Sequence, residues 1–257
     1  MDMNADKDAV RRFWNEAPCG TRDVAAEDER AKFAELQRQR DAREGFIARY
    51  ARFGETAGLK VLEVGVGAGS DHVRFARAGA ECTGVDLSEV SLATTRRRFE
   101  LEGLHSDLRV ADAEHLPFAD GTFDVVYSWG VIHHTPDTPR AAAEILRVLR
   151  PNGRFTVMVY NRHSLLAAQA WMVFAALRGK PNRSIGDVLA KHVESPGTKA
   201  YTVGEARRLF AAAHGVAVDT IVTAYDMRVG RRHFLPRWTW RLAPSRFGWF
   251  HVVSGRK

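Results

Sequence analysis

Short apolar runs alternate with amphipathic segments along much of this chain, which is the pattern of strands that alternate with helices. Residues 61–64 (VLEV) form a compact apolar run that stops at Gly65, so we predict a short buried strand over 60–64. The same criteria predict strands over 81–87, 108–111, 123–128 and 153–160, and helices over 71–78, 89–101 and 138–149. The alternation indicates an α/β fold.

The segments on either side continue this pattern less regularly. Residues 27–53 place charged residues on one side and apolar residues on the other, which predicts one or two helices. Thr202 and Glu205 form a T-x-x-E capping box at the start of a helix predicted over 202–213. Further predicted elements are an amphipathic helix over 164–177, a strand over 216–224 and a last strand over 247–254.

A glycine loop follows the first predicted strand and precedes a predicted helix. Gly65, Gly67 and Gly69 alternate along it, so the chain can turn sharply and approach a ligand closely. In parallel α/β sheets, ligands bind at such strand-to-helix junctions. The G-x-G-x-x-G motif of dinucleotide-binding proteins does not fit, because its last position holds Ser70 in one frame and His72 in the other. The loop predicts a ligand site of another kind.

Composition places the chain among soluble globular proteins. Its 257 residues are 45% hydrophobic and 27% charged, enough for one well-buried domain. No apolar run approaches the roughly 20 residues of a membrane helix, and residues 1–12 are too charged for a secretory signal, so we expect a cytoplasmic protein. Cys19 and Cys82 are too few for a disulfide scaffold or a metal site, although Cys19 could be reactive.

The net charge of +7 is concentrated at the end of the chain. Residues 228–257 hold eight basic and no acidic residues, while residues 1–227 are near neutral. Such a basic segment is typical of proteins that bind nucleic acid, an anionic membrane or an acidic substrate. An arginine-rich solvated surface explains it equally well.

Several motifs together resemble one family. Glu63-x-Gly-x-Gly-x-Gly69 closely resembles the first motif of class I S-adenosylmethionine (SAM) dependent methyltransferases. Three later stretches extend the resemblance over about residues 56–160. They are VADAEHLPF (110–118) with FDVVYS (123–128), WGVIHHTPD (129–137), and EILRVLRPNGR (144–154). The second of these resembles the type 11 group, which includes enzymes of ubiquinone and menaquinone biosynthesis.

The resemblance implies the rest of the architecture. It implies a Rossmann-like, doubly wound, seven-stranded sheet, mostly parallel, with helices on both faces. The last strand would lie antiparallel between the fifth and sixth. Residues 1–55 would form an N-terminal helical cap and residues 56–257 the methyltransferase domain. Within that domain, residues 161–202 are a candidate lid, with dimer contact as the alternative, and residues 228–247 form a basic aromatic segment.

The resemblance also implies the cofactor, SAM, with S-adenosylhomocysteine as the product. The glycines would lie under its amino-acid end, Asp86 would accept the ribose hydroxyls, and Asp112 would receive the adenine amino group. Asp86 could instead cap the next helix, and Glu63 could hold the loop from behind. The expected cofactor-binding residues are Glu63, Gly65, Val66, Gly67, Gly69, Asp86, Leu87, Ser88, Asp112, Ala113, Ser128 and Trp129.

The candidate catalytic residues are His133 and His134, in the loop that would face the methyl group. An imidazole can take a proton from a hydroxyl near neutral pH, although a histidine here could also serve only to orient the loop. Trp14, which could equally pack on the core, is one of six candidate substrate-binding residues. The six are Trp14, Tyr160, Asn161, Arg162, His192 and Tyr201. We expect no metal.

The expected function is methyl transfer from SAM to a small molecule by in-line displacement, in which the protein mainly aligns the reactants and excludes water. The acceptor would be a mainly apolar molecule, and we leave open whether it also carries an acidic group. One alternative is an RNA or protein methyltransferase that uses the basic segment, although the chain lacks an Asn-Pro-Pro-Tyr motif. Another is a SAM-binding partner subunit without activity. We expect no nucleic-acid partner and leave open a homodimer.

Overall fold

The computed structural model describes residues 3–18, 20–21, 24, 28–229 and 233–257. Cys19, the cysteine that could be reactive, and residues 230–232 of the basic aromatic segment lie outside this described part. Cys82 is buried in the core, as a strand residue should be.

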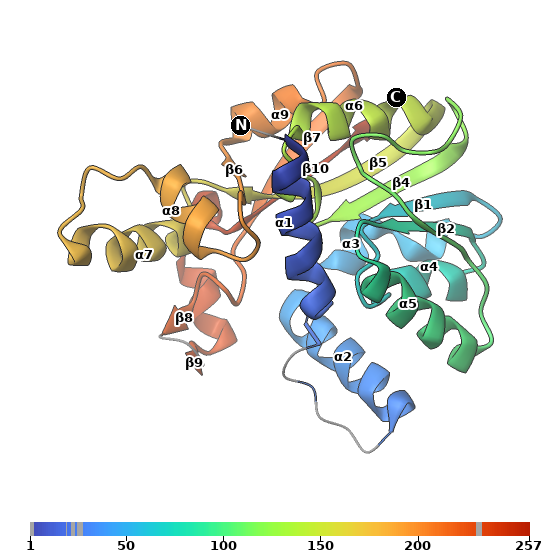
Figure 1. Cartoon of the computed structure of the whole chain (residues 1–257), viewed down its shortest axis with the longest axis horizontal. Coiled ribbons are helices and arrows are strands. Elements are labelled where there is room, and N and C mark those ends of the chain that lie inside the picture. The colour runs from blue at the N-terminus through green and yellow to red at the C-terminus, as the bar shows by residue number, and fades with distance from the viewer. Residues whose placement is uncertain (1–2, 19, 22–23, 25–27, 230–232) are drawn as a thin grey trace.

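One mixed sheet runs through the middle of the molecule (Figure 1). Its strands are β1 (Lys60–Val64), β2 (Glu81–Asp86), β3 (Asp107–Val110), β4 (Phe123–Trp129), β5 (Leu149–Asn161), β6 (Ala200–Tyr201), β7 (His214–Ile221) and β10 (Phe250–Arg256). The order is β3-β2-β1-β4-β5-β10-β7, and the short β6 pairs with the end of β5. β10 is antiparallel to both β5 and β7, which confirms the predicted Rossmann-like sheet and its antiparallel last strand.

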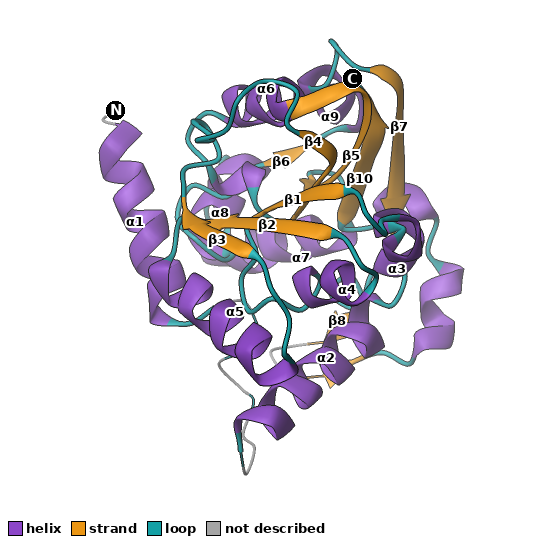
Figure 2. Cartoon of the chain, turned by 90° about the vertical axis from the view of Figure 1, so that its right-hand side faces the viewer, coloured by secondary structure: helices purple, strands orange, loops and turns teal. Residues whose placement is uncertain are grey.

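Helices cover both faces of this sheet (Figure 2). The α-helices are α1 (Met3–Glu16), α2 (Glu29–Glu44), α3 (Ile47–Ala51), α4 (His72–Arg77), α5 (Glu89–Glu102), α6 (Thr138–Val148), α7 (Leu165–Phe174), α8 (Ile185–His192) and α9 (Val203–Leu209). The 3-10 turns are η1 (Phe53–Glu55), η2 (Ile132–His134), η3 (Ala176–Arg178), η4 (Arg237–Leu242) and η5 (Ser245–Phe247), and β8 (Arg228–Val229) pairs with β9 (His233–Phe234).

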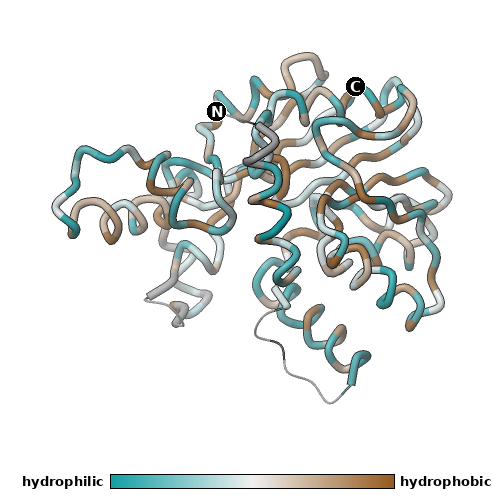
Figure 3. Tube along the Cα trace, in the orientation of Figure 1, coloured by the Kyte–Doolittle hydropathy of each residue, from teal (hydrophilic) through white to brown (hydrophobic). Residues whose placement is uncertain are grey.

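The hydrophobic core has two halves because successive strand residues point to opposite faces. Val61 of β1 packs in the half that includes Phe75 of α4, whereas Leu62 and Val64 pack in the half that includes Ile145 of α6. Both halves are buried, so β1 reads as a continuous apolar run. Figure 3 shows this concentration of hydrophobic residues along the central strands.

Four short elements, α8, β6, β8 and β9, were not predicted from the sequence. The polar stretch after residue 178 contains α8, which Ser184 caps by accepting a hydrogen bond from the Asp187 backbone N–H. Val188 and Leu189 bury one side of this helix in the core that also contains residues of α7. β6, β8 and β9 have two residues each. Runs this short carry too few residues for a recognisable period.

The chain between Ser164 and Lys199 forms a lobe beyond the edge of the sheet, at the left of Figure 1. We call it the α7–α8 lobe; it contains α7, η3 and α8. Among the described residues, none of the helices has both the length and the apolar character that crossing a bilayer requires.

Close packing under the glycine loop gives a test of this architecture. A Cβ on Gly84 of β2 would lie 2.6 Å from Val66 Cγ1 and 2.8 Å from Leu108 Cδ2. We expect Gly84→Ala to lower the free energy of unfolding by about 1–3 kcal/mol, because neighbouring groups must move. Urea denaturation measures this change.

The matched control is Gly54→Ala. A Cβ on Gly54 would meet nothing within 4 Å, so we expect a change below about 0.5 kcal/mol. Equal changes in the two variants would contradict the packing described around β2.

Candidate functional site

A cavity of about 680 Å³ lies at the carboxyl ends of the central strands. The ends of β1, β2 and β4 contribute Gly65, Asp86 and Trp129 to its wall. α1 and α2 contribute further residues from one side, and the α7–α8 lobe closes the other side. The wall is polar near the glycine loop and largely apolar beside the lobe.

The glycine loop adopts backbone conformations that only glycine tolerates well. Gly65 has a φ of 85°, and a Cβ there would lie 2.2 Å from Val131 Cγ2. Gly67 has a φ of 54°, lines the cavity, and a Cβ there would meet nothing within 4 Å. The loop therefore presents bare backbone to whatever occupies the cavity.

Asp86 is held rigidly at the tip of β2. Its Oδ2 accepts a hydrogen bond from the Gly67 N–H at 3.0 Å, and its Oδ1 accepts one from the Ser88 N–H at 2.8 Å. Burial raises the pKa of Asp86 to about 6. The carboxylate thus joins the glycine loop to the start of α5 and still faces the cavity.

Glu63 forms a neutral hydrogen-bonded pair with His72 behind the loop. Ser106 Oγ donates to the Cys82 carbonyl, so it accepts from His72 Nε2 at 2.7 Å. His72 Nδ1 then lacks a proton and must accept from Glu63 Oε2 at 3.0 Å. Burial lowers the pKa of His72 to about 3, and burial with the charge of Asp71 raises that of Glu63 well above its ordinary value.

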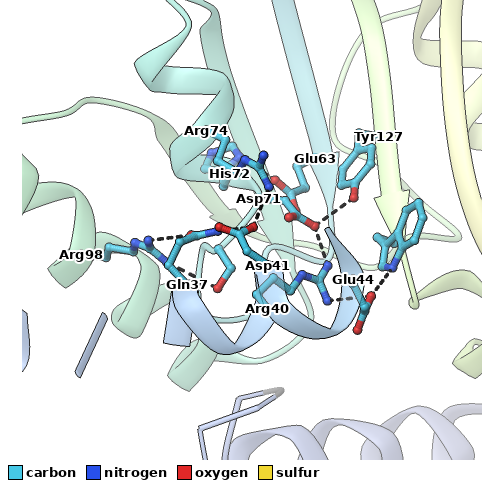
Figure 4. Close-up of polar contacts among 12 residues, drawn as sticks. Gln37, Arg40, Asp41, Glu44, Glu63, Asp71, His72, Arg74, Arg98 and Tyr127 are labelled. Atoms are coloured by element: carbon cyan, nitrogen blue, oxygen red, sulfur yellow. Dashed lines mark hydrogen bonds and ion pairs between the residues drawn. The ribbon is translucent and has the colours of Figure 1, made fainter. Parts of the chain in front are cut away.

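A buried charged cluster lies beside this pair (Figure 4). Arg40 of α2 pairs with Asp71 at 2.5 Å and with Glu44 at 3.2 Å. Tyr127 of β4 donates to Asp71 at 2.9 Å, and Trp129 Nε1 donates to Glu44 at 3.0 Å. Although burial opposes it, the charges of Asp71 and Glu44 raise the pKa of Arg40 well above its ordinary value.

Arg40 and Glu44 line the cavity, and sequence reasoning missed both. Arg40 Nε is buried without a hydrogen-bond partner among the described residues, so it is available to a bound anion. The spacing of i and i+4 on a predicted helix was the only signal, and it is common on solvated helices.

α1 also contributes to the cavity wall, through Lys7, Val10 and Trp14. Lys7 Nζ lies 2.6 Å from Asp112 Oδ2 and 2.5 Å from Glu114 Oε2. Although burial opposes it, hydrogen bonds from Lys7 and the Glu114 backbone lower the pKa of Asp112. Asp112 is therefore an ionised acceptor, already paired with a lysine that sequence reasoning did not anticipate.

A titratable cluster joins the end of β4 to the α7–α8 lobe. His134 Nδ1 lies 2.8 Å from Ser195 Oγ and 3.0 Å from Thr198 Oγ1. His134 Nε2 lies 3.3 Å from Glu194 Oε2, and the Tyr160 hydroxyl donates to the same oxygen at 2.6 Å. His134, Tyr160 and Glu194 all line the cavity.

Glu194 is unusual in its backbone as well as its contacts. Its φ of 55° is left-handed, a conformation that costs a non-glycine residue about 1–3 kcal/mol. Although burial opposes it, the hydrogen bond and charge of His134 and the hydrogen bond from Tyr160 lower the pKa of Glu194. The lobe therefore presents an ionised carboxylate to His134. Sequence reasoning missed Glu194 because its partners are distant in the chain.

The neighbouring His133 has a different position. His133 is fully buried and is not among the described residues that line the cavity, whereas His134 is. Burial, followed by the charges of His134 and Lys199, lowers the pKa of His133 well below its ordinary value. Of the two candidate bases, the structure brings only His134 to the cavity wall.

Just over half of the predicted site residues line the cavity, and the roles of all of them stay predictions. Those on the wall are Trp14, Gly65, Gly67, Asp86, Leu87, Asp112, Ala113, Trp129, His134, Tyr160 and His192. Those outside it are Glu63, Val66, Gly69, Ser88, His133, Ser128, Asn161, Arg162 and Tyr201.

The residues outside the wall support the framework. Ser88 caps α5, and Ser128 Oγ donates to the Val64 carbonyl. Asn161 Nδ2 donates to the Arg246 and Gly248 carbonyls, which fixes the chain before β10. Arg162 pairs with Glu205 of α9 at 2.9 Å, and Tyr201 packs beside the core on the α9 face.

Among the described residues, two groups of side chains have ligand atoms close enough together to hold one metal ion. The ligand atoms of His133, His134 and Glu194 lie within 4.8 Å of one another, and so do those of Asp112, Glu114 and His115. In the second group Lys7 already pairs with both carboxylates. Neither group has a further observation that would assign an ion to it.

Comparison with known proteins identifies the central part of the chain. Residues 62–157 match the family model described as a methyltransferase domain, type 11. Methyltransferase GfsG of Streptomyces halstedii is 40% identical over 111 residues, which cover 42% of this chain and 40% of that protein. The phthiotriol/phenolphthiotriol dimycocerosates methyltransferase of Mycobacterium tuberculosis is 36% identical over 134 residues, 51% of this chain and 49% of that protein. The chain thus matches half or less of the length of these relatives.

A solved structure extends the similarity to the whole fold. The geranyl diphosphate C-methyltransferase of Streptomyces coelicolor A3(2), in complex with Mg²⁺, geranyl diphosphate and S-adenosylhomocysteine, superimposes with a TM-score of 0.62. The two chains are 18% identical, and the match covers 98% of this chain and 97% of that chain. This similarity confirms the predicted fold class.

The buried charged cluster can be tested by removing its cation. We expect Arg40→Ala to lower the free energy of unfolding by about 3–5 kcal/mol, because Asp71 and Glu44 are left buried without their partner. Arg38→Ala, on the exposed side of α2, is the matched control, with an expected change below about 0.5 kcal/mol. Urea denaturation measures both; a similar change in both variants would contradict the role of the cluster.

Proposed function

Because the chain carries a class I SAM-dependent methyltransferase domain of type 11, we propose that it transfers the methyl group of SAM to a small-molecule acceptor. The observation that carries the proposal is a glycine loop and a buried carboxylate, Asp86, side by side on one cavity wall at the strand ends. The acceptor is an apolar molecule that bears a nucleophilic group, and the transfer is an in-line displacement.

The polar half of the cavity fits SAM. Asp86 and the bare backbone of Gly67 suit the ribose, and Asp112 with Ala113 suits the adenine. Arg40 and Glu44 place a cation and an anion near the loop, a match for the carboxylate and ammonium groups of an amino acid. When bound, SAM supplies an electrophilic methyl group.

The half beside the α7–α8 lobe fits an apolar acceptor. α7 contributes five residues to this wall, and four of them are apolar, with aromatic side chains opposite. The residues are Leu166, Gln169, Ala170, Val173 and Phe174 of α7, with Trp14, Trp249 and Phe250 opposite. Such walls exclude water and orient a ligand through few polar contacts. We propose that the lobe acts as the lid of this half, and that residues 1–55 act as a cap over the SAM half.

His134 and Glu194 are the proposed proton acceptors. They stand between the two halves, at the end of β4. A hydroxyl nucleophile loses its proton as it attacks the methyl carbon; the Glu194 carboxylate can take that proton and share it with His134 Nε2, which lies 3.3 Å from Glu194 Oε2. Tyr160 fixes the carboxylate in place. The acceptor that suits this pair carries a weakly acidic hydroxyl.

The RNA or protein alternative draws its support from the basic segment. The residues of 228–247 whose side chains the structure describes do not line the cavity. A macromolecular substrate would therefore have to reach the site past the α7–α8 lobe, whereas a small molecule fits behind it.

Replacing Asp86 tests the SAM half. We expect Asp86→Ala to weaken SAM binding by about 1–3 kcal/mol, because charge-assisted bonds to the ribose are lost. Isothermal titration calorimetry measures this change. Asp107→Ala, an exposed carboxylate on the adjacent β3, is the control and should leave SAM affinity unchanged. Unaltered affinity in Asp86→Ala would remove this residue from the site.

Because burial raises the pKa of Asp86 to about 6, the same bonds give a pH dependence. Above pH 6 the group is an ionised acceptor, and below it the group becomes protonated and loses half of its acceptor capacity. We therefore expect SAM affinity to fall as the pH drops through about 6, and Asp86→Asn to flatten this profile.

Replacing Glu194 tests the proton acceptor. We expect Glu194→Gln and His134→Gln each to lower kcat by about 10–100-fold with a hydroxyl acceptor, because proton removal loses its base, while SAM still binds. Formation of S-adenosylhomocysteine over a panel of apolar phenols, alcohols and acids measures turnover.

Asp187→Asn, in the same lobe but away from the wall, is the control for this substitution. Full activity in both site variants would mean that the acceptor needs no base. An absence of turnover with every acceptor, together with SAM binding, would favour the partner-subunit alternative.

A further inference from the structure

α7 carries no charged side chain, and one amide, Gln169, among its apolar residues, although the helix lies at the edge of the molecule. Residues 165–177 contain no charged side chain. Ala167 is buried in the core, yet Met172 is 49%, Val173 48% and Leu177 76% exposed. Helices that are apolar on every side normally lie in a protein core or a membrane. Contacts within the protein therefore do not explain why the outer side of α7 is apolar. Figures 1 and 3 show this helix at the outer edge of the lobe.

The basic aromatic segment lies next to the same helix. Gln169 Nε2 of α7 donates to the Asp226 carbonyl, immediately before β8. Beyond β9, Leu235 is exposed, and the Trp238 side chain is 66% exposed. Figures 1 and 2 both place β8 below α7. A second apolar, aromatic stretch thus accompanies α7.

Basic residues outnumber acidic ones in the two segments that carry these exposed apolar side chains. Residues 161–202 hold six basic and two acidic residues, and residues 228–257 hold eight basic and none acidic. The two acidic side chains are engaged locally, Asp187 by Arg183 and Lys191, and Glu194 by the cavity cluster. Arg178 and Lys180 follow Leu177 closely in the chain and are both exposed, so this part of the surface is positively charged.

We propose that this face docks on an anionic lipid bilayer. We call it the docking face and define it by Met172, Val173, Leu177, Arg178, Lys180, Leu235 and Trp238. Its apolar side chains enter the acyl boundary, and its cations meet anionic head groups. Tryptophan is enriched at that depth in membrane proteins. Charge complementarity selects this occupant over a second copy of the chain, because a two-fold interface would bring identical cationic rims together.

The docking face is also the outer side of the cavity wall. Val173 is half exposed and lines the cavity, and its neighbour Phe174 lines it too. A molecule in the bilayer leaflet that contacts this face would then be separated from the site by the thickness of one helix. This connection rests on the proposed function, since it supplies the apolar acceptor from the membrane; the docking itself does not depend on catalysis.

Vesicle flotation tests the docking face without an activity measurement. We expect the full chain to float with vesicles of phosphatidylcholine and phosphatidylglycerol, to bind vesicles of phosphatidylcholine alone at least about ten-fold more weakly, and to dissociate as salt increases. Trp238 fluorescence should shift to shorter wavelength on binding, and Trp238→Phe should reduce that shift.

Matched substitutions locate the contact. We expect Leu177→Ser to weaken binding about ten-fold, because an apolar side chain no longer enters the bilayer. Val110→Ser, an exposed apolar residue on β3 far from the lobe in sequence, should leave binding unchanged. Arg178→Gln with Lys180→Gln should weaken binding to anionic vesicles by at least about ten-fold.

Three outcomes would overturn the proposal. The first is no flotation with anionic vesicles. The second is equal loss in Leu177→Ser and Val110→Ser. The third is a dimer of the full chain in size-exclusion chromatography that Leu177→Ser converts to a monomer, without vesicle binding, which would make the face a contact between copies. SAM affinity, measured in parallel, shows that each variant is folded and separates this result from a failure of the proposed function.

Discussion

The buried ion pair between Arg40 and Asp71 is the contact on which the site depends most. Asp71 directly follows the glycine loop, and Arg40 comes from a helix that precedes the first strand. A buried carboxylate needs a partner, and removal of either charge leaves the other uncompensated. The pair, with Tyr127 and Glu44 around it, fixes α2 against the loop and against β4. The cavity has a polar end because this cluster forms part of its wall.

The same cluster explains the protonation of its neighbour. Glu63 is buried close to Asp71, and burial together with the negative charge of Asp71 raises the pKa of Glu63 well above its ordinary value. Glu63 therefore remains an acid that donates to neutral His72. The glycine loop therefore rests on a neutral hydrogen-bonded chain on one side and a charged cluster on the other. Together they hold the loop backbone in place, and they leave Arg40 Nε and Asp71 Oδ1 buried without a hydrogen-bond partner among the described residues.

The parts of the fold that sequence predicted are those set by local pattern. β1 and the glycine loop are contiguous, and Asp86 ends the next predicted strand, so period and spacing were sufficient to place them. Arg40, Glu44 and Lys7 reach the cavity from helices that precede β1 in the chain. Nothing in the local sequence distinguishes them from solvated charges. Asn161 and Arg162 were predicted at the correct strand end, but their side chains turn into backbone contacts that no spacing rule encodes.

The cavity wall changes from polar at the glycine loop to apolar at the α7–α8 lobe. This change in polarity separates the places where two different ligands would bind. Fixed charges at the glycine loop suit a zwitterionic, sugar-bearing ligand, whereas the lobe offers apolar side chains that gain from contact with an apolar molecule. The two ligands would therefore bind at opposite ends without competition and meet near the end of β4. His134 and Glu194 lie at that boundary, where one comes from the sheet and the other from the lobe. Their pairing requires the lobe to be in place, so the proposed proton acceptor is complete only when the lobe covers the apolar half.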